Sequence, residues 1–104
     1  IVKRVIAVAG QEVEIDYDAN TVYVDGVALD EPYINQEDED VMVERSGMVY
    51  REFTVPKGCI FVMGDNRNGS TDSRYAELGM VDTGYVLGRA LCVAFPFSHI
   101  QSLL

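Results

Sequence analysis

Polar and apolar residues alternate along much of the first half of the chain, and a period of two is typical of half-buried β-strands. Residues 12–17 are the clearest case, because Val, Ile and Tyr occupy every second position. Asp25-Gly26 separates two short apolar stretches, and an Asp-Gly pair in that setting predicts a two-residue hairpin. Residues 59–63 are continuously apolar, which suits a strand covered on both faces. These patterns predict an all-β chain.

The second half of the chain is less regular. We expect a second hairpin over residues 41–55, with a turn near Ser46-Gly47, and a last strand within residues 86–97. Residues 64–78 are polar and predict a long irregular loop. Loops of this length are uncommon in compact domains unless they carry a function. This loop is therefore the first place to look for a site.

Charge is distributed unevenly along the sequence. Residues 12–44 contain twelve acidic residues and no Lys or Arg, whereas the rest carries eight basic against five acidic residues. An acidic block repels a phosphate backbone, so nucleic acid is not expected as a partner, and we interpret the block as a solvated face. No stretch approaches the roughly 20 apolar residues that span a bilayer. We expect the chain by itself to be soluble, with any membrane anchor outside it.

The two cysteines, Cys59 and Cys92, lie in apolar runs without a second Cys or a His at ligand spacing. This setting favours buried thiols, leaves a disulfide open, and predicts no metal site.

Within the loop, residues 64–74 read Gly-Asp-Asn-Arg-Asn-Gly-Ser-Thr-Asp-Ser-Arg. The segment holds two closely spaced Asp/Arg pairs, with amide and hydroxyl side chains between them that can bond the backbone. Taken by themselves, these residues fit a self-bracing surface loop. The Lys3-Arg4 pair near the start does not by itself indicate a function, because such a pair on a strand most often lies at a solvated edge.

The loop resembles the most diagnostic motif of the bacterial type I signal peptidases, Gly-Asp-Asn-Arg followed by a short spacer and Ser-x-Asp-Ser-Arg. Residues 3–10, Lys-Arg-Val-Ile-Ala-Val-Ala-Gly, resemble the family's Lys-Arg-Val-Ile-Gly-x-Pro-Gly motif, and Gly-Arg-Ala at 88–90 resembles the segment that follows. The motifs occur in family order. The resemblance implies a partial catalytic β core, residues 1–17 and 56–104, with an acidic β-ribbon insertion at residues 18–55.

The chemistry implied by the resemblance is amide hydrolysis by a Ser/Lys dyad without a cofactor. A lysine serves as base when its surroundings disfavour the ammonium form, as burial in an apolar pocket does. The resemblance assigns Lys3 as the general base and Ser70 as the residue that orients its amine. It also implies a supporting set of charged residues, namely Arg67 and the ion pairs Arg4/Asp65 and Asp72/Arg74.

The family's nucleophile lies in a Ser-Met-x-Pro motif upstream of the lysine, and none of the five serines here has that context. We therefore expect the nucleophile outside this chain, and the isolated chain to be inactive and prone to self-association through uncovered sheet edges. The resemblance places the parent enzyme in the bacterial cytoplasmic membrane with its catalytic domain on the outer side. Its substrates would be secretory preproteins with small residues before the cut.

Two other functions stay open at this point. A non-catalytic relative would bind exported peptides or a partner protein, although the presence of Lys3 and Ser70 together with Asp72 and Arg74 argues against it. A self-cleaving repressor-type peptidase would use the same dyad. Such a peptidase would lack the Gly-Asp-Asn-Arg loop and would not need the acidic ribbon.

Overall fold

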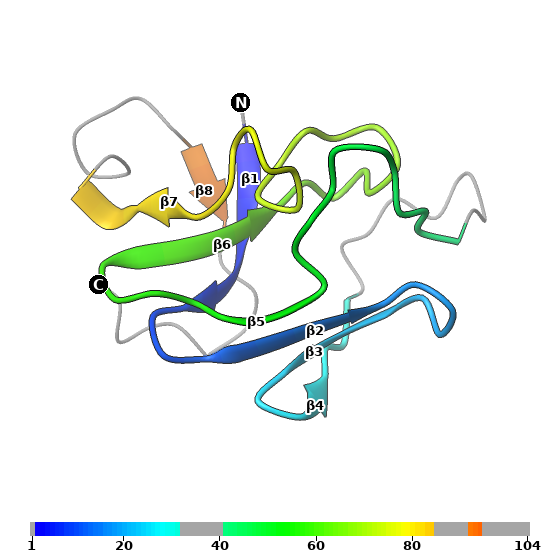
Figure 1. Cartoon of the computed structure of the whole chain (residues 1–104), viewed down its shortest axis with the longest axis horizontal. Coiled ribbons are helices and arrows are strands. Elements are labelled where there is room, and N and C mark those ends of the chain that lie inside the picture. The colour runs from blue at the N-terminus through cyan, green and yellow to red at the C-terminus, as the bar shows by residue number, and fades with distance from the viewer. Residues whose placement is uncertain (1, 32–40, 85–91, 95–104) are drawn as a thin grey trace.

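The protein is described here by a computed structural model that covers residues 2–31, 41–84 and 92–94 (Figure 1). These residues contain eight strands arranged in two four-stranded sheets. The first sheet has the order β7-β6-β1-β8 and consists of β1 (Val2–Val8), β6 (Cys59–Met63), β7 (Val81–Asp82) and β8 (Cys92–Ala94). The second has the order β4-β3-β2-β5 and consists of β2 (Glu12–Asp16), β3 (Thr21–Val24), β4 (Val27–Ala28) and β5 (Glu52–Thr54). The predicted all-β class is confirmed.

Strand β1 lies inside the first sheet, because it pairs antiparallel with β6 and parallel with β8. Lys3 stands opposite Val93 of β8, and Arg4 stands opposite Met63 of β6. An irregularity in the β1–β6 register falls between Val5 and Ala7. The Lys3-Arg4 pair therefore occupies an interior strand, and the solvated-edge interpretation does not apply.

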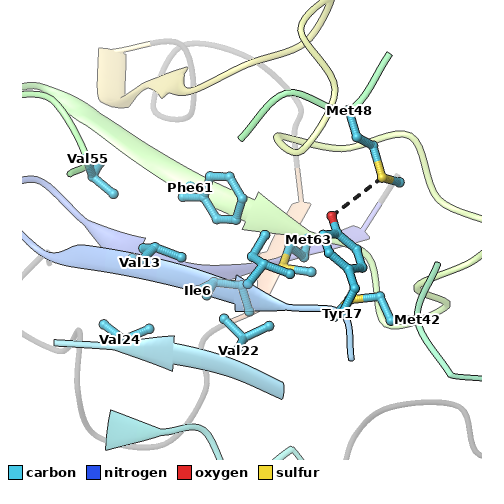
Figure 2. Packing of buried hydrophobic residues seen from close by; sticks show 12 residues of the cluster. Ile6, Val13, Tyr17, Val22, Val24, Met42, Met48, Val55, Phe61 and Met63 are labelled. Atoms are coloured by element: carbon cyan, nitrogen blue, oxygen red, sulfur yellow. Dashed lines mark hydrogen bonds between the residues drawn. The ribbon is translucent and has the colours of Figure 1, made fainter. Parts of the chain in front are cut away.

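The hydrophobic core fills the space between the two sheets. Phe61 and Met63 of β6 pack there with Val13 of β2 and Val22 of β3, each of them almost fully buried (Figure 2). The alternate residues of β6, Ile60 and Val62, belong to a separate apolar cluster. Strand β6 is thus covered on both faces, as its continuous apolar run predicts.

Local turn chemistry sets the second sheet. Asp25 and Gly26 both have positive φ, at 52° and 80°, and they connect β3 to β4 in the two-residue hairpin that the Asp-Gly pair predicts. Strand β2 pairs with β3 on one side and with β5 on the other. The residues of β2, which sequence reasoning assigned to the core segment 1–17, thus share a sheet with strands from segment 18–55. The division into core and insertion stays a prediction.

The hairpin predicted over residues 41–55 is wrong. Residues 41–45 form no strand, and β5 pairs with β2 in their place. The backbone of residues 47–49 bonds the loop instead, since Val49 N–H donates to Arg74 O at 3.0 Å and Ala76 N–H to Gly47 O at 2.9 Å. Two longer-range pairings, that of β5 with β2 and that of residues 47–49 with residues 74–76, therefore replace the predicted local hairpin.

The predictions for the last strand and for the two cysteines fall partly outside the described residues. Strand β8 lies within the predicted final strand, and the rest of residues 86–97, including the Gly-Arg-Ala segment, lies outside the described residues. Cys59 is a free and partly buried thiol, whereas the side chain of Cys92 is outside the described part. Within the described ranges, no helix has the length and apolar character needed to cross a membrane.

Candidate active site

Lys3 and Ser70 meet although 67 positions separate them in the sequence. The side-chain nitrogen Nζ of Lys3 donates a hydrogen bond to Ser70 Oγ at 2.6 Å, and both residues are partly buried. Lys3 is held by the pairing of β1 inside its sheet, and Ser70 is carried by the loop that follows β6. The hydroxyl fixes the position of the amine. An amine held in this way can exchange a proton with a group bound beside it.

Gly64 at the start of the loop makes room for this contact. A Cβ built on Gly64 would overlap Ser70 Oγ and lie 2.5 Å from Ser70 Cβ, and it would come within 3.6 Å of Lys3 Nζ. Real Cβ atoms do not approach a neighbour so closely, so any side chain here would displace Ser70. The first residue of the motif is therefore glycine because the hydroxyl occupies the space of its side chain.

Asp72 and Arg74 form an ion pair with no exposed side-chain surface on either partner. Arg74 Nε and Nη2 donate to the two carboxylate oxygens at 2.8 and 2.9 Å, the fork geometry that makes such pairs strong. Asp72 Oδ2 also accepts the Gly64 N–H at 2.9 Å. Removing one member of a buried pair leaves an uncompensated charge and costs about 3–5 kcal/mol. The buried Nη1 of Arg74 has no partner among the described residues.

Ser73, to which sequence reasoning gave no role, attaches the loop to β6. Its N–H donates to Val62 O at 3.0 Å, and its hydroxyl accepts the Val62 N–H at 3.0 Å. The residue is fully buried. Its place between Asp72 and Arg74 was the only signal in the sequence, and a serine there is equally compatible with solvent exposure.

Arg67 lies inside the loop with only 5% of its side chain exposed. Its Nε donates to Gly64 O at 2.8 Å, and its two terminal nitrogens each donate to one carboxylate oxygen of Glu31 at 3.1 Å. Glu31 was also missed from the sequence, because it belongs to the acidic block that we interpreted as a solvated face.

The remaining predicted residues, Arg4 and Asp65, form a forked ion pair with both nitrogen–oxygen distances at 2.9 Å. The hydrogen bonds from Arg4 hold the pKa of the Asp65 carboxyl below its usual value. The charges of Arg4 and Arg67 act in the same direction, and partial burial opposes them. Every predicted site residue thus lies in or against the loop at residues 64–74.

Comparisons with known proteins identify the family of the chain. Residues 1–95 match the family described as signal peptidase, peptidase S26. The chain belongs to the signal peptidase family. It is 41% identical over 103 residues to signal peptidase I of Bacillus licheniformis and 38% identical over 103 residues to signal peptidase I T of Bacillus subtilis (strain 168), covering 96% of this chain in each case.

A crystal structure of a signal peptidase I from Enterococcus faecalis V583 superimposes with a TM-score of 0.58 at 34% sequence identity. The match covers 79% of this chain and 74% of that chain. The chain spans about half the length of the two Bacillus signal peptidases, 53% and 51%. Fold and family membership therefore agree, and the roles of individual residues stay predictions.

The Arg4–Asp65 pair predicts a pH-dependent contribution to stability. Because the folded pKa of Asp65 is lowered, its contribution is present above the unfolded pKa of about 3.9 and is lost as the pH falls through the folded pKa. Asp65→Asn should therefore reduce the free energy of unfolding by no more than about 1 kcal/mol near neutral pH, since the carboxylate is 39% exposed. The difference should vanish in acid, as measured by urea unfolding at several pH values.

The control is the same substitution in an Arg4→Gln background, where the acid-dependent difference should be much smaller, since the charge of Arg67 is then the remaining cause that lowers the pKa of Asp65. A difference that persists unchanged in that background would assign it to another partner of Asp65.

Proposed function

We propose that the protein to which this chain belongs is a serine endopeptidase that removes signal peptides from exported preproteins by means of a Ser/Lys dyad. The observation that carries the proposal is the 2.6 Å contact between Lys3 Nζ and Ser70 Oγ in a chain of the signal peptidase family. A lysine base needs a neighbouring group that fixes the position of its amine. The Ser70 hydroxyl is such a group, and the buried Asp72–Arg74 ion pair braces the loop that carries it.

In the proposed reaction Lys3 is the general base and the nucleophile is a serine outside residues 1–104. The Lys3 amine takes the proton of that serine as its oxygen attacks the scissile carbonyl, and it then passes the proton to the departing amine. Ser70 orients Lys3 through the hydrogen bond. Asp72 and Arg74, which belong to the loop, brace it through their buried ion pair, and the isolated chain is inactive.

We place this activity in the bacterial cytoplasmic membrane, with the catalytic domain on its outer side. The substrates are secretory preproteins that carry small residues before the cleavage site. The names of the relatives, signal peptidase I and signal peptidase I T, support this substrate class. The membrane attachment, like the nucleophile, belongs to parts of the protein beyond these residues.

Replacement of Lys3 tests the base. In the full-length protein Lys3→Arg should lower kcat for preprotein cleavage by roughly 100- to 10,000-fold, because a guanidinium stays protonated and cannot accept a proton. The control is Lys57→Arg at an exposed turn position, which should cleave normally. Normal cleavage by Lys3→Arg would rule out the dyad, and binding of preproteins without cleavage by the wild-type protein would favour a non-catalytic domain.

Replacement of Ser70 separates orientation from nucleophilic attack. Loss of one hydrogen bond to a charged group costs about 1.5–3 kcal/mol, so Ser70→Ala should retain activity that is roughly 10- to 150-fold lower. The measurement is kcat for preprotein cleavage by the full-length protein. Complete loss of turnover in Ser70→Ala, together with an acyl-enzyme adduct on Ser70 of the wild-type protein found by mass spectrometry, would make Ser70 the nucleophile.

A further inference from the structure

The forked ion pair between Arg67 and Glu31 joins the catalytic loop to a segment 36 positions earlier in the chain. Only 5% of the Arg67 side chain and 9% of the Glu31 side chain are exposed. A buried guanidinium needs a counter-charge, because transfer of an unpaired ion out of water is unfavourable. Glu31 supplies that charge, and it lies outside every motif on which the family resemblance depends.

Arg67 binds the backbone of Gly64, the residue against which the Ser70 hydroxyl packs in its contact with Lys3. Its Nε holds the carbonyl of Gly64 at 2.8 Å, while Asp72 holds the N–H of the same residue at 2.9 Å. The two peptide groups of Gly64 are therefore both fixed by charged side chains. Because Ser70 Oγ occupies the space next to the Gly64 Cα, a rotation of Gly64 would move or block the hydroxyl that contacts Lys3.

The backbone of Arg67 takes part as well. Its carbonyl accepts a hydrogen bond from Arg74 Nη2 at 2.7 Å, which connects it to the buried Asp72–Arg74 pair. A shift of Arg67 would thus disturb both supports of the loop. Networks of charged hydrogen bonds in a region of low dielectric constant are strong when every member is satisfied and costly when one is removed.

We propose that Glu31 is a positioning residue for the Lys3–Ser70 pair, which it influences through Arg67 and the Gly64 carbonyl.

Asn68, the residue after Arg67, binds the chain where residues 41–43 approach the loop. Asn68 Nδ2 donates to Val41 O at 3.2 Å, and Val43 N–H donates to Asn68 Oδ1 at 2.9 Å. Two consecutive loop residues are therefore anchored to Glu31, at the end of the segment after β4, and to residues 41–43.

The kinetic part of the test rests on the proposed peptidase function and uses the full-length protein. Glu31→Gln keeps the size of the side chain and removes its charge. We expect kcat for preprotein cleavage to fall roughly 10- to 100-fold with KM little changed, because small misplacements of a catalytic group lower the rate by such factors. The matched control is Glu44→Gln, which removes an exposed ion pair to Arg51 and should change kcat less than roughly twofold.

A double-substitution cycle shows whether Glu31 acts through Arg67. In an Arg67→Met background, Glu31→Gln should cause no further fall in kcat, because the connection from Glu31 to the Gly64 carbonyl through Arg67 is already gone. Arg67→Gln serves the same purpose if the Met variant does not fold, since glutamine removes the positive charge and keeps a polar side chain. An equal fall in kcat with and without Arg67, or a lower melting temperature with unchanged kcat, would overturn the proposal.

Hydrogen exchange of residues 64–74, followed by mass spectrometry, gives a readout that does not depend on cleavage. Exchange should be faster in Glu31→Gln than in the wild type and unchanged in Glu44→Gln. Unaltered exchange in Glu31→Gln contradicts the positioning role. If the wild-type protein cleaves no preprotein, the proposed function fails, and the exchange measurement still decides whether Glu31 positions the loop.

Discussion

The buried ion pair between Asp72 and Arg74 is the interaction on which the loop depends. Two full charges with no exposed surface must be satisfied by each other and by nearby backbone groups, and this requirement leaves the loop few conformations. Asp72 accepts a hydrogen bond from the Gly64 N–H, and Arg74 donates one to the Arg67 carbonyl. A polar segment without regular secondary structure thereby acquires a defined shape beside Lys3.

The two sheets contribute to this arrangement in different ways. The first sheet presents Lys3 on an interior strand and begins the loop at the end of β6. The second sheet packs against it through the core, and the segment after β4 delivers Glu31 to the loop. The loop is therefore braced by residues from both sides of the molecule, which joins the acidic segment physically to the candidate active site.

The features that could be predicted from the sequence were local or carried by a motif. Asp25-Gly26 specifies its hairpin through backbone preference alone, and the alternation of residues 12–17 marks a half-buried strand wherever its partners come from. The contact of Lys3 with Ser70 was expected only through the family resemblance, since nothing in the spacing of the two residues indicates that they meet.

The failures involve partners far apart in the chain. Residues 41–43 have the apolar, valine-rich composition of a strand, yet their neighbours pair with β2 and with the loop, and only the folded structure decides that competition. Glu31 lies in a stretch with the composition of a solvated acidic face, yet only 9% of its side chain is exposed where it pairs with Arg67. Propensity describes single segments, whereas these outcomes depend on which segments become neighbours.

The central claim is that the loop places Ser70 against Lys3 in the space left by the missing side chain of Gly64. The most direct measurement is preprotein cleavage by full-length Gly64→Ala, which alters neither Lys3 nor Ser70 chemically. The matched control is Gly69→Ala in the same loop, whose methyl group meets only the side chain of the exposed Asn66. We expect Gly64→Ala to lose roughly 100-fold or more in kcat and Gly69→Ala to stay near the wild type. Wild-type cleavage by Gly64→Ala would contradict the account.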